Sequence, residues 1–168
     1  SAERLYGLTF DDRIVTFNAA NPEIILSSRP IMGLAAGDSL VGLDLRPATG
    51  MLYTLGTSGT LYRLEPTGAT YTAMPVMLSA MPMGTAFGFD FNPVPDRLRL
   101  VSDTGQNLRI NADTGATIVD GMIMSDTGPV MLVAAAYTNN VAGATSTTLY
   151  AIDAVSDRLV RSTNPNAG

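Results

Sequence analysis

The densest group of side chains that could do chemistry lies between residues 88 and 115, in the stretch GFDFNPVPDRLRLVSDTGQNLRINADTG. Carboxylate oxygens are the ligands that calcium prefers, and the carboxylates considered for such a site are those of Asp90, Asp103 and Asp113. The alternative is that each polar residue acts locally. Residues 92–93 and 113–115 stand where hairpins turn, and Asn, Asp and Gly are favoured there for their backbone hydrogen bonds and their tolerance of positive φ.

The residue types that are missing narrow the chemistry. All ten basic residues are arginine, and the sequence contains no Lys, His, Cys or Trp. This composition excludes a Ser-His-Asp triad, a cysteine nucleophile, the usual zinc ligands and a Schiff-base lysine. We therefore expect no catalytic residue and no resident cofactor, with bound calcium as an alternative. The alternative function is a carbohydrate-active or lactonase-like enzyme that uses carboxylates and calcium.

Charge and hydropathy restrict the partners. The net charge is −5 and the pI is about 4.5, whereas nucleic-acid binding depends on basic surface. The longest apolar stretch, residues 122–137, is interrupted by Asp126 and Pro129, so no transmembrane segment is expected. The sequence therefore predicts neither a nucleic-acid partner nor a membrane-spanning segment.

A second candidate group is the methionine-rich segment MPVMLSAMPMG at residues 74–84, which contains Met74, Met77, Met81 and Met83. Thioethers can bind Cu(I), but methionines also fill irregular gaps or offer an adaptable apolar surface to a partner. Pro75 and Pro82 predict an irregular connection. We favour an interaction surface at these four methionines, which Met122, Met124 and Met131 could extend.

The chain contains an internal repeat. GLDLRPATGMLYTLGTSGTLYRLEPTGATY (42–71) aligns with residues 88–118, and Asp44 corresponds to Asp90, 46 residues later. Fainter copies occupy residues 5–22 and 148–160, which predicts four units near 1–30, 31–75, 76–122 and 123–168. Repetition of the polar positions favours a scaffold role for most of them. The residues found only in the 88–118 copy, Asp103, Gln106 and Asn107, form the candidate family-specific site.

Within each unit, apolar and polar residues alternate, and the alternating runs are separated by Gly, Pro, Asn and Asp. This pattern predicts hairpin-linked strands. Four short strands in a repeat of roughly 40–50 residues are typical of β-propeller blades. We expect an all-β, propeller-like fold of about four blades, each a four-stranded antiparallel sheet. The units number slightly fewer than four, which leaves three alternatives: they close as a small ring, they are a piece of a longer propeller, or a partner completes the ring. An incomplete ring would expose strand edges, which proteins normally cover, and this predicts a partner.

Three arginines in the third unit, Arg97, Arg99 and Arg109, alternate with leucines on two strands and so share one face. A row of arginines beside acidic turns is typical of a solvated, ion-paired face that contributes little stability. Arginine is also enriched at protein interfaces.

The run from Gly88 to Gly115, with its G-F-D-F-N-P, D-R-L-R-L-V-S, G-Q-N-L-R and D-T-G parts, resembles the bacterial DUF4394 family. Residues 5–22 and 148–168 are similar to the flanking segments of that family. The resemblance implies a propeller-like fold and a bacterial, usually exported protein, periplasmic or secreted, and it implies no activity. Family members usually continue past the N-P-N-A-G segment, whereas this sequence ends at Gly168, which leaves open whether the ring closes within one chain. Together with the composition, this leads us to expect a non-enzymatic extracytoplasmic interaction module, an accessory or structural subunit of a larger membrane-associated assembly that it joins through a protein partner.

Overall fold

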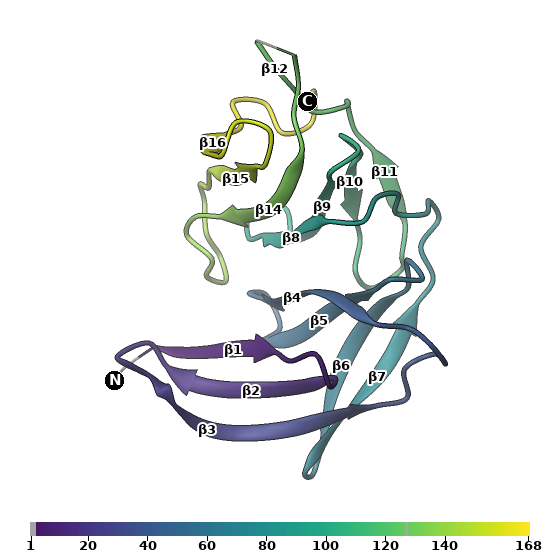
Figure 1. Cartoon of the computed structure of the whole chain (residues 1–168), viewed down its shortest axis with the longest axis vertical. Helices are drawn as coiled ribbons and strands as arrows, with labels where there is room; N and C mark the ends of the chain where they lie inside the picture. Colours follow the sequence, from purple (N-terminus) through teal and green to yellow (C-terminus); the bar gives the residue numbers. More distant parts are fainter. Residues whose placement is uncertain (1–2, 127) are drawn as a thin grey trace.

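A computed structural model describes residues 3–126 and 128–168, and every regular element in these ranges is a β-strand (Figure 1). In the same ranges we find no helix with the length and apolarity needed to cross a membrane. The all-β prediction is confirmed.

The first seven strands form one sheet in the order β1-β2-β3-β7-β6-β5-β4. Their bounds are β1 (Arg4–Leu8), β2 (Arg13–Asn18), β3 (Asn21–Met32), β4 (Leu40–Arg46), β5 (Met51–Gly56), β6 (Leu61–Thr67) and β7 (Thr70–Val76). All neighbours are antiparallel except β3 and β7, which pair in parallel through Ile31 and Met32 of β3. The sheet curls until its edge strands β1 and β4 touch, so it is nearly closed into a barrel.

The remaining strands form three smaller antiparallel sheets. The first contains β8 (Phe87–Asn92), β9 (Arg97–Ser102), β10 (Asn107–Ile110) and β11 (Thr117–Val119), and the second is the short pair β12 (Met124–Ser125) and β13 (Gly128–Pro129). The third contains β14 (Leu132–Tyr137), β15 (Leu149–Asp153) and β16 (Arg158–Arg161). The expected four strands per sheet are thus found in β8–β11, while the first two units share one sheet. The parallel pairing of β3 with β7 joins these two units. No hairpin connects the two strands, so the alternation of residues within a unit could not predict their pairing.

The duplication is visible in the backbone. Gly59 and Gly105, 46 residues apart, have φ values of 83° and 81° at the β5–β6 and β9–β10 turns. Gly50 and Asp96, related by the same shift, both have positive φ, 70° and 52°. A left-handed conformation is easy for glycine and is one of the few that Asp adopts readily.

Two large apolar clusters hold the units together. One fills the interior of the seven-stranded sheet, and the other joins that sheet to β8–β11. In the second cluster the rings of Tyr53 and Phe91 meet edge to face with their centroids 5.2 Å apart, an arrangement that favours aromatic pairs. β8 therefore packs against β4 on one side and against β14 on the other (Figure 1).

Candidate functional site

The β9–β10 turn forms hydrogen bonds with the methionine-rich connection that leads from β7 to β8. The carboxylate of Asp103 accepts hydrogen bonds from the backbone nitrogen of Thr85 at 3.0 Å and from its hydroxyl at 2.7 Å. These bonds lower the pKa of Asp103. Gln106 accepts a hydrogen bond from the backbone nitrogen of Met83 at 2.7 Å and donates one to the carbonyl of Met81 at 3.1 Å. Two groups that were predicted separately, the methionine segment and the family-specific residues, are thus in direct contact.

The same contact recurs one unit earlier in the chain. The hydroxyl of Thr57 accepts a hydrogen bond from the backbone nitrogen of Ser39 at 3.2 Å. Thr57 lies 46 residues before Asp103, and Ser39 lies 46 residues before Thr85. In both units, the turn between the second and third strands is hydrogen-bonded to the connection that precedes the first strand. This contact is therefore a property of the repeat, and in the later unit it is made by the carboxylate of Asp103.

The connection exposes its methionine side chains to solvent. Met77 is 80% exposed, Met81 60% and Met83 59%. Met122, from the next connection, is 63% exposed and lies against the same turn, since a Cβ on Gly105 would stand 3.1 Å from its Cγ. We call these four side chains the methionine surface. Met124 and Met131 are exposed as well.

Met74 differs from its expected position. It lies in strand β7, opposite Arg63 of β6, and is not part of the irregular connection. Pro75 follows it inside the strand, where it faces Tyr62. Because β7 pairs with β3 only at Tyr71 and Thr72, the other side of Pro75 is a free edge, which is where a strand tolerates proline.

Asn107 lies apart from Asp103 and Gln106, in the interior. Its amide nitrogen donates to the carbonyls of Gly121 at 3.0 Å and Pro165 at 2.8 Å, and its oxygen accepts from Arg99 at 2.7 Å. It ties β10 to the connection that follows β11 and to the last residues of the chain. The expectation that Arg99 lies on a solvated face is wrong, because β14 and the 164–167 segment cover it and leave it 2% exposed.

Buried Arg99 is neutralised by Asp120. The two side chains are 2.7 Å apart, and Arg109 binds the other carboxylate oxygen of Asp120 at 2.9 Å. A comparable pairing occurs at Arg46, which binds Asp96 and Asp113, both at 2.6 Å, and these partners raise the Arg46 pKa. Each of the two buried arginines, Arg46 and Arg99, thus binds an aspartate that lies at least 20 residues away in the sequence.

The repeated aspartates Asp44 and Asp90 link strands of successive units, β4 to β8 and β8 to β14. Asp44 accepts a hydrogen bond from the backbone nitrogen of Phe91 at 2.7 Å, and Asp90 accepts one from that of Tyr137, also at 2.7 Å. Burial raises the pKa of Asp44 to about 6. Burial, followed by the charge of Asp44, raises the pKa of Asp90 to about 8. The scaffold interpretation of the repeated aspartate accounts for both bonds.

The carboxylates considered as calcium ligands have separate partners. Asp90 binds the backbone of β14, Asp103 binds Thr85, and Asp113 binds Arg46. In the part of the chain that the structure describes, no three Asp, Glu, His or Cys side chains are grouped closely enough to hold a metal ion.

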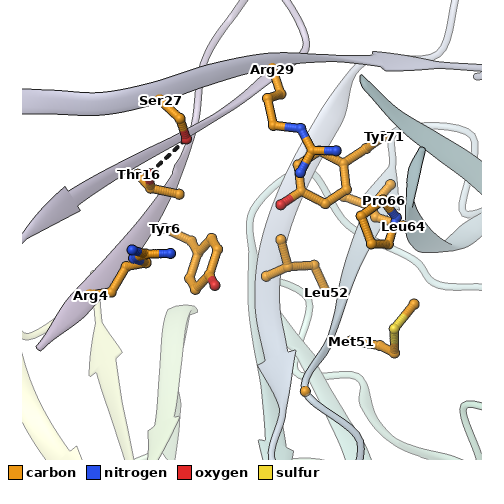
Figure 2. Close-up of a pocket in the computed structure, with 11 residues that line it drawn as sticks. Arg4, Tyr6, Thr16, Ser27, Arg29, Met51, Leu52, Leu64, Pro66 and Tyr71 are labelled. Atoms are coloured by element: carbon orange, nitrogen blue, oxygen red, sulfur yellow. Dashed lines mark hydrogen bonds between the residues drawn. The ribbon is translucent and has the colours of Figure 1, made fainter. Parts of the chain in front are cut away.

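A cavity of about 300 Å³ opens between the first two units, inside the seven-stranded sheet. Figure 2 shows the guanidinium of Arg29 stacked on the ring of Tyr71, with Tyr6 across the cavity. The guanidinium carbon Cζ of Arg29 lies 4.3 Å from the centre of the Tyr71 ring. Arg29 also donates to the carbonyls of Gly68 and Thr70, and Thr16 and Ser27 share a hydrogen bond. The sequence provided no signal for this cavity, because its walls come from two units that meet through the parallel pairing of β3 with β7 and through the contact of β1 with β4.

A comparison with curated proteins gave no match. A family model described as "Domain of unknown function (DUF4394)" matches residues 13–168, which is nearly the whole chain and includes the turn, the connection and the linked aspartates described above. The chain therefore belongs to the DUF4394 family.

Proposed function

We propose that this protein is a non-enzymatic, extracytoplasmic interaction module that binds a protein partner through the methionine surface. The proposal rests on one observation about the 77–86 connection: its methionine side chains are exposed to solvent, while its backbone is held in place. Its methionines are largely exposed, while its backbone is held by hydrogen bonds to Gln106, Asp103 and Gly115.

A fixed backbone in this connection lowers the entropic cost of binding a partner. A surface segment that is ordered before the partner arrives loses less conformational entropy on association. Methionine side chains remain adaptable on such a backbone and make favourable contacts with aromatic and aliphatic groups. An exposed cluster of large apolar side chains is costly in water and is typical of a surface that a partner covers.

The arrangement of the units is compatible with a propeller-like scaffold. Strands β4, β8 and β14, one from each of three successive units, are packed so that β8 contacts both of the others, and Asp44 and Asp90 bridge the two pairs. In such a scaffold the blades surround a central channel, and the methionine connection leads from one blade to the next. The methionine surface would then be the binding site of an accessory subunit in a membrane-associated assembly outside the cytoplasm.

Site-specific photo-crosslinking in the bacterium that makes the protein tests this function. A photoreactive amino acid is placed at Met81 or Met83, and at Phe10 as a control, because Phe10 is an exposed apolar residue in the distant β1–β2 turn. We expect the same discrete protein to be crosslinked from positions 81 and 83 and not from position 10. Absence of a discrete adduct at the methionines, or the same adducts at all three positions, contradicts the proposal.

The identified partner then allows a quantitative check. Met81→Ser combined with Met83→Ser should weaken its binding by about 2 kcal/mol, the threshold for an interface hot spot, while Phe10→Ser should leave binding unchanged. Cell fractionation checks the extracytoplasmic location separately, since recovery of the protein from the cytoplasm would contradict only that part.

A further inference from the structure

A second, polar cavity of about 130 Å³ lies between the β8–β11 sheet, strand β14 and the end of the chain. Its walls include three guanidinium groups and three neutral polar side chains, those of Arg97, Arg99, Arg109, Asn92, Tyr137 and Asn166. Nothing in the sequence grouped these six residues, since Tyr137 and Asn166 come from segments that follow the 88–115 stretch.

The cavity carries an excess of positive charge. Arg99 and Arg109 share the single carboxylate of Asp120. Arg97 uses one nitrogen to donate to the backbone carbonyls of Pro95 and Asp96, and among the described residues it forms no ion pair. Three cations are therefore balanced by one directly bound carboxylate.

The three neutral groups use their oxygen acceptors within the protein. The side-chain oxygen of Asn92 accepts from the backbone nitrogen of Val94 at 3.1 Å. The side-chain oxygen of Asn166 accepts from Arg99 at 2.7 Å, and the hydroxyl oxygen of Tyr137 accepts from Arg99 at 3.2 Å. These bonds leave the two amide NH₂ groups and the phenolic hydrogen as donors.

The guanidinium groups also retain donors. Arginine has five N–H bonds; within the described residues, Arg97 and Arg109 each use two of them and Arg99 uses four. Each of the six lining side chains thus keeps at least one N–H or O–H for which residues 3–126 and 128–168 provide no acceptor. A cavity lined by positive charge and by unused donors matches a ligand that only accepts hydrogen bonds.

We propose that this cavity binds the anionic oxygen group of a small molecule, a phosphate or a carboxylate. Guanidinium groups form their strongest hydrogen bonds with these two groups. The volume corresponds to about four water molecules at roughly 30 Å³ each, enough for one such group.

The rest of the ligand has an adjoining space. A cavity of about 360 Å³ shares Asn92 and Tyr137 with the first. Its other lining residues are four with hydroxyl side chains, one further arginine and two apolar residues: Thr147, Thr148, Ser162, Thr163, Arg161, Leu149 and Pro165. Hydroxyl side chains donate and accept hydrogen bonds, so they suit a hydroxylated body. The ligand class is therefore a small polyhydroxylated acid or phosphate ester, and this inference is independent of the methionine surface.

Titration calorimetry of the full chain at low ionic strength tests the site with inorganic phosphate, glucose 6-phosphate and glucose as probes. We expect phosphate to bind, glucose 6-phosphate to bind at least about tenfold more tightly, and glucose not to bind. Arg97→Gln and Tyr137→Phe should each weaken binding of both anions by about tenfold or more, the loss expected for one charge-assisted hydrogen bond.

Arg13→Gln is the matched control, because Arg13 is another partly exposed arginine, in the first unit, with hydrogen bonds to Ser28. It should leave binding unchanged, and circular dichroism should show that all three variants are folded. If neither anion binds, or if Arg97→Gln and Tyr137→Phe bind phosphate as the unmodified protein does (an adventitious ion only), the anion site is overturned. Equal affinity for phosphate and glucose 6-phosphate overturns the assignment of the adjoining cavity.

Discussion

The carboxylate of Asp44 binds the backbone nitrogen of the residue next to Asp90, and Asp90 repeats the same bond to the following unit. Each bond spans 47 residues. The two aspartates therefore link β4 to β8 and β8 to β14, strands of three successive units. Both carboxyl groups are partly buried, and burial raises the pKa of each.

These raised pKa values predict a stability that falls as the pH rises. The folded state holds the two protons more tightly than the unfolded chain, so the stabilisation is complete below about pH 4 and is lost as the pH passes through about 6 and about 8. Urea unfolding at pH 5 and pH 9 should show a loss on the order of 5 kcal/mol, most of it from Asp90. Asp90→Asn, which stays neutral and can still accept from Tyr137, should remove most of that loss.

Asp90→Ala serves as the control for the pH effect. It leaves the backbone nitrogen of Tyr137 without its partner, so at both pH values it should be about 1–3 kcal/mol less stable than Asp90→Asn, which keeps that partner and does not titrate either. An unchanged pH dependence in Asp90→Asn would show that this carboxyl group is not the titrating one.

Asp120 and Asp113 both bind arginine but differ in burial. The side chain of Asp120 is 5% exposed and that of Asp113 is 59% exposed. Asp120→Asn should lower the free energy of unfolding by about 3–5 kcal/mol, because buried Arg99 loses its counter-charge. Asp113→Asn should cost at most about 1 kcal/mol, since Arg46 also keeps Asp96. Denaturant unfolding of the two variants checks this, and equal losses would contradict it.

Gly68 and Gly115 occupy equivalent turns with φ values of 60° and 73°. Alanine at either position should cost about 1–2 kcal/mol for the left-handed backbone. At Gly115 the new Cβ would also stand 1.8 Å from the carbonyl oxygen of Met77, whereas at Gly68 no atom lies within 4 Å. Gly115→Ala should therefore lower the melting temperature clearly more than Gly68→Ala and should loosen the 77–86 connection towards proteolysis. Similar melting temperatures would contradict the close approach.

Gln106 should control the order of the methionine connection. Gln106→Ala removes the partners of the Met83 nitrogen and the Met81 carbonyl, and about 1 kcal/mol of lost local stability should speed amide exchange at Met83 roughly fivefold. Gln106→Glu keeps the acceptor and loses the donor, so its exchange rate should be intermediate. Hydrogen-exchange mass spectrometry of residues 77–86 measures both, and unchanged rates would show that the turn does not hold the connection.

Several features followed from the sequence because they depend on local pattern. Alternation predicted the strands, and Gly, Asn and Asp marked their turns, so the all-β class is confirmed. The pairing of Asp44 with Asp90 across the repeat indicated a scaffold role, and both residues bridge units. The pattern was misleading at Arg99, because period-two alternation places a side chain on a face without saying what covers that face.

The sequence alone determined the repeat, the hairpin-rich β fold, the family resemblance and the exclusion of histidine, cysteine and lysine chemistry. Only the tertiary structure decided that β3 joins two units in one sheet, that Asp103 and Gln106 hold the methionine connection, and that six donors from distant segments line one cavity. The reason is physical. Strands and turns depend on neighbouring residues in the chain, whereas each of these contacts joins segments far apart in sequence and depends on how whole sheets pack.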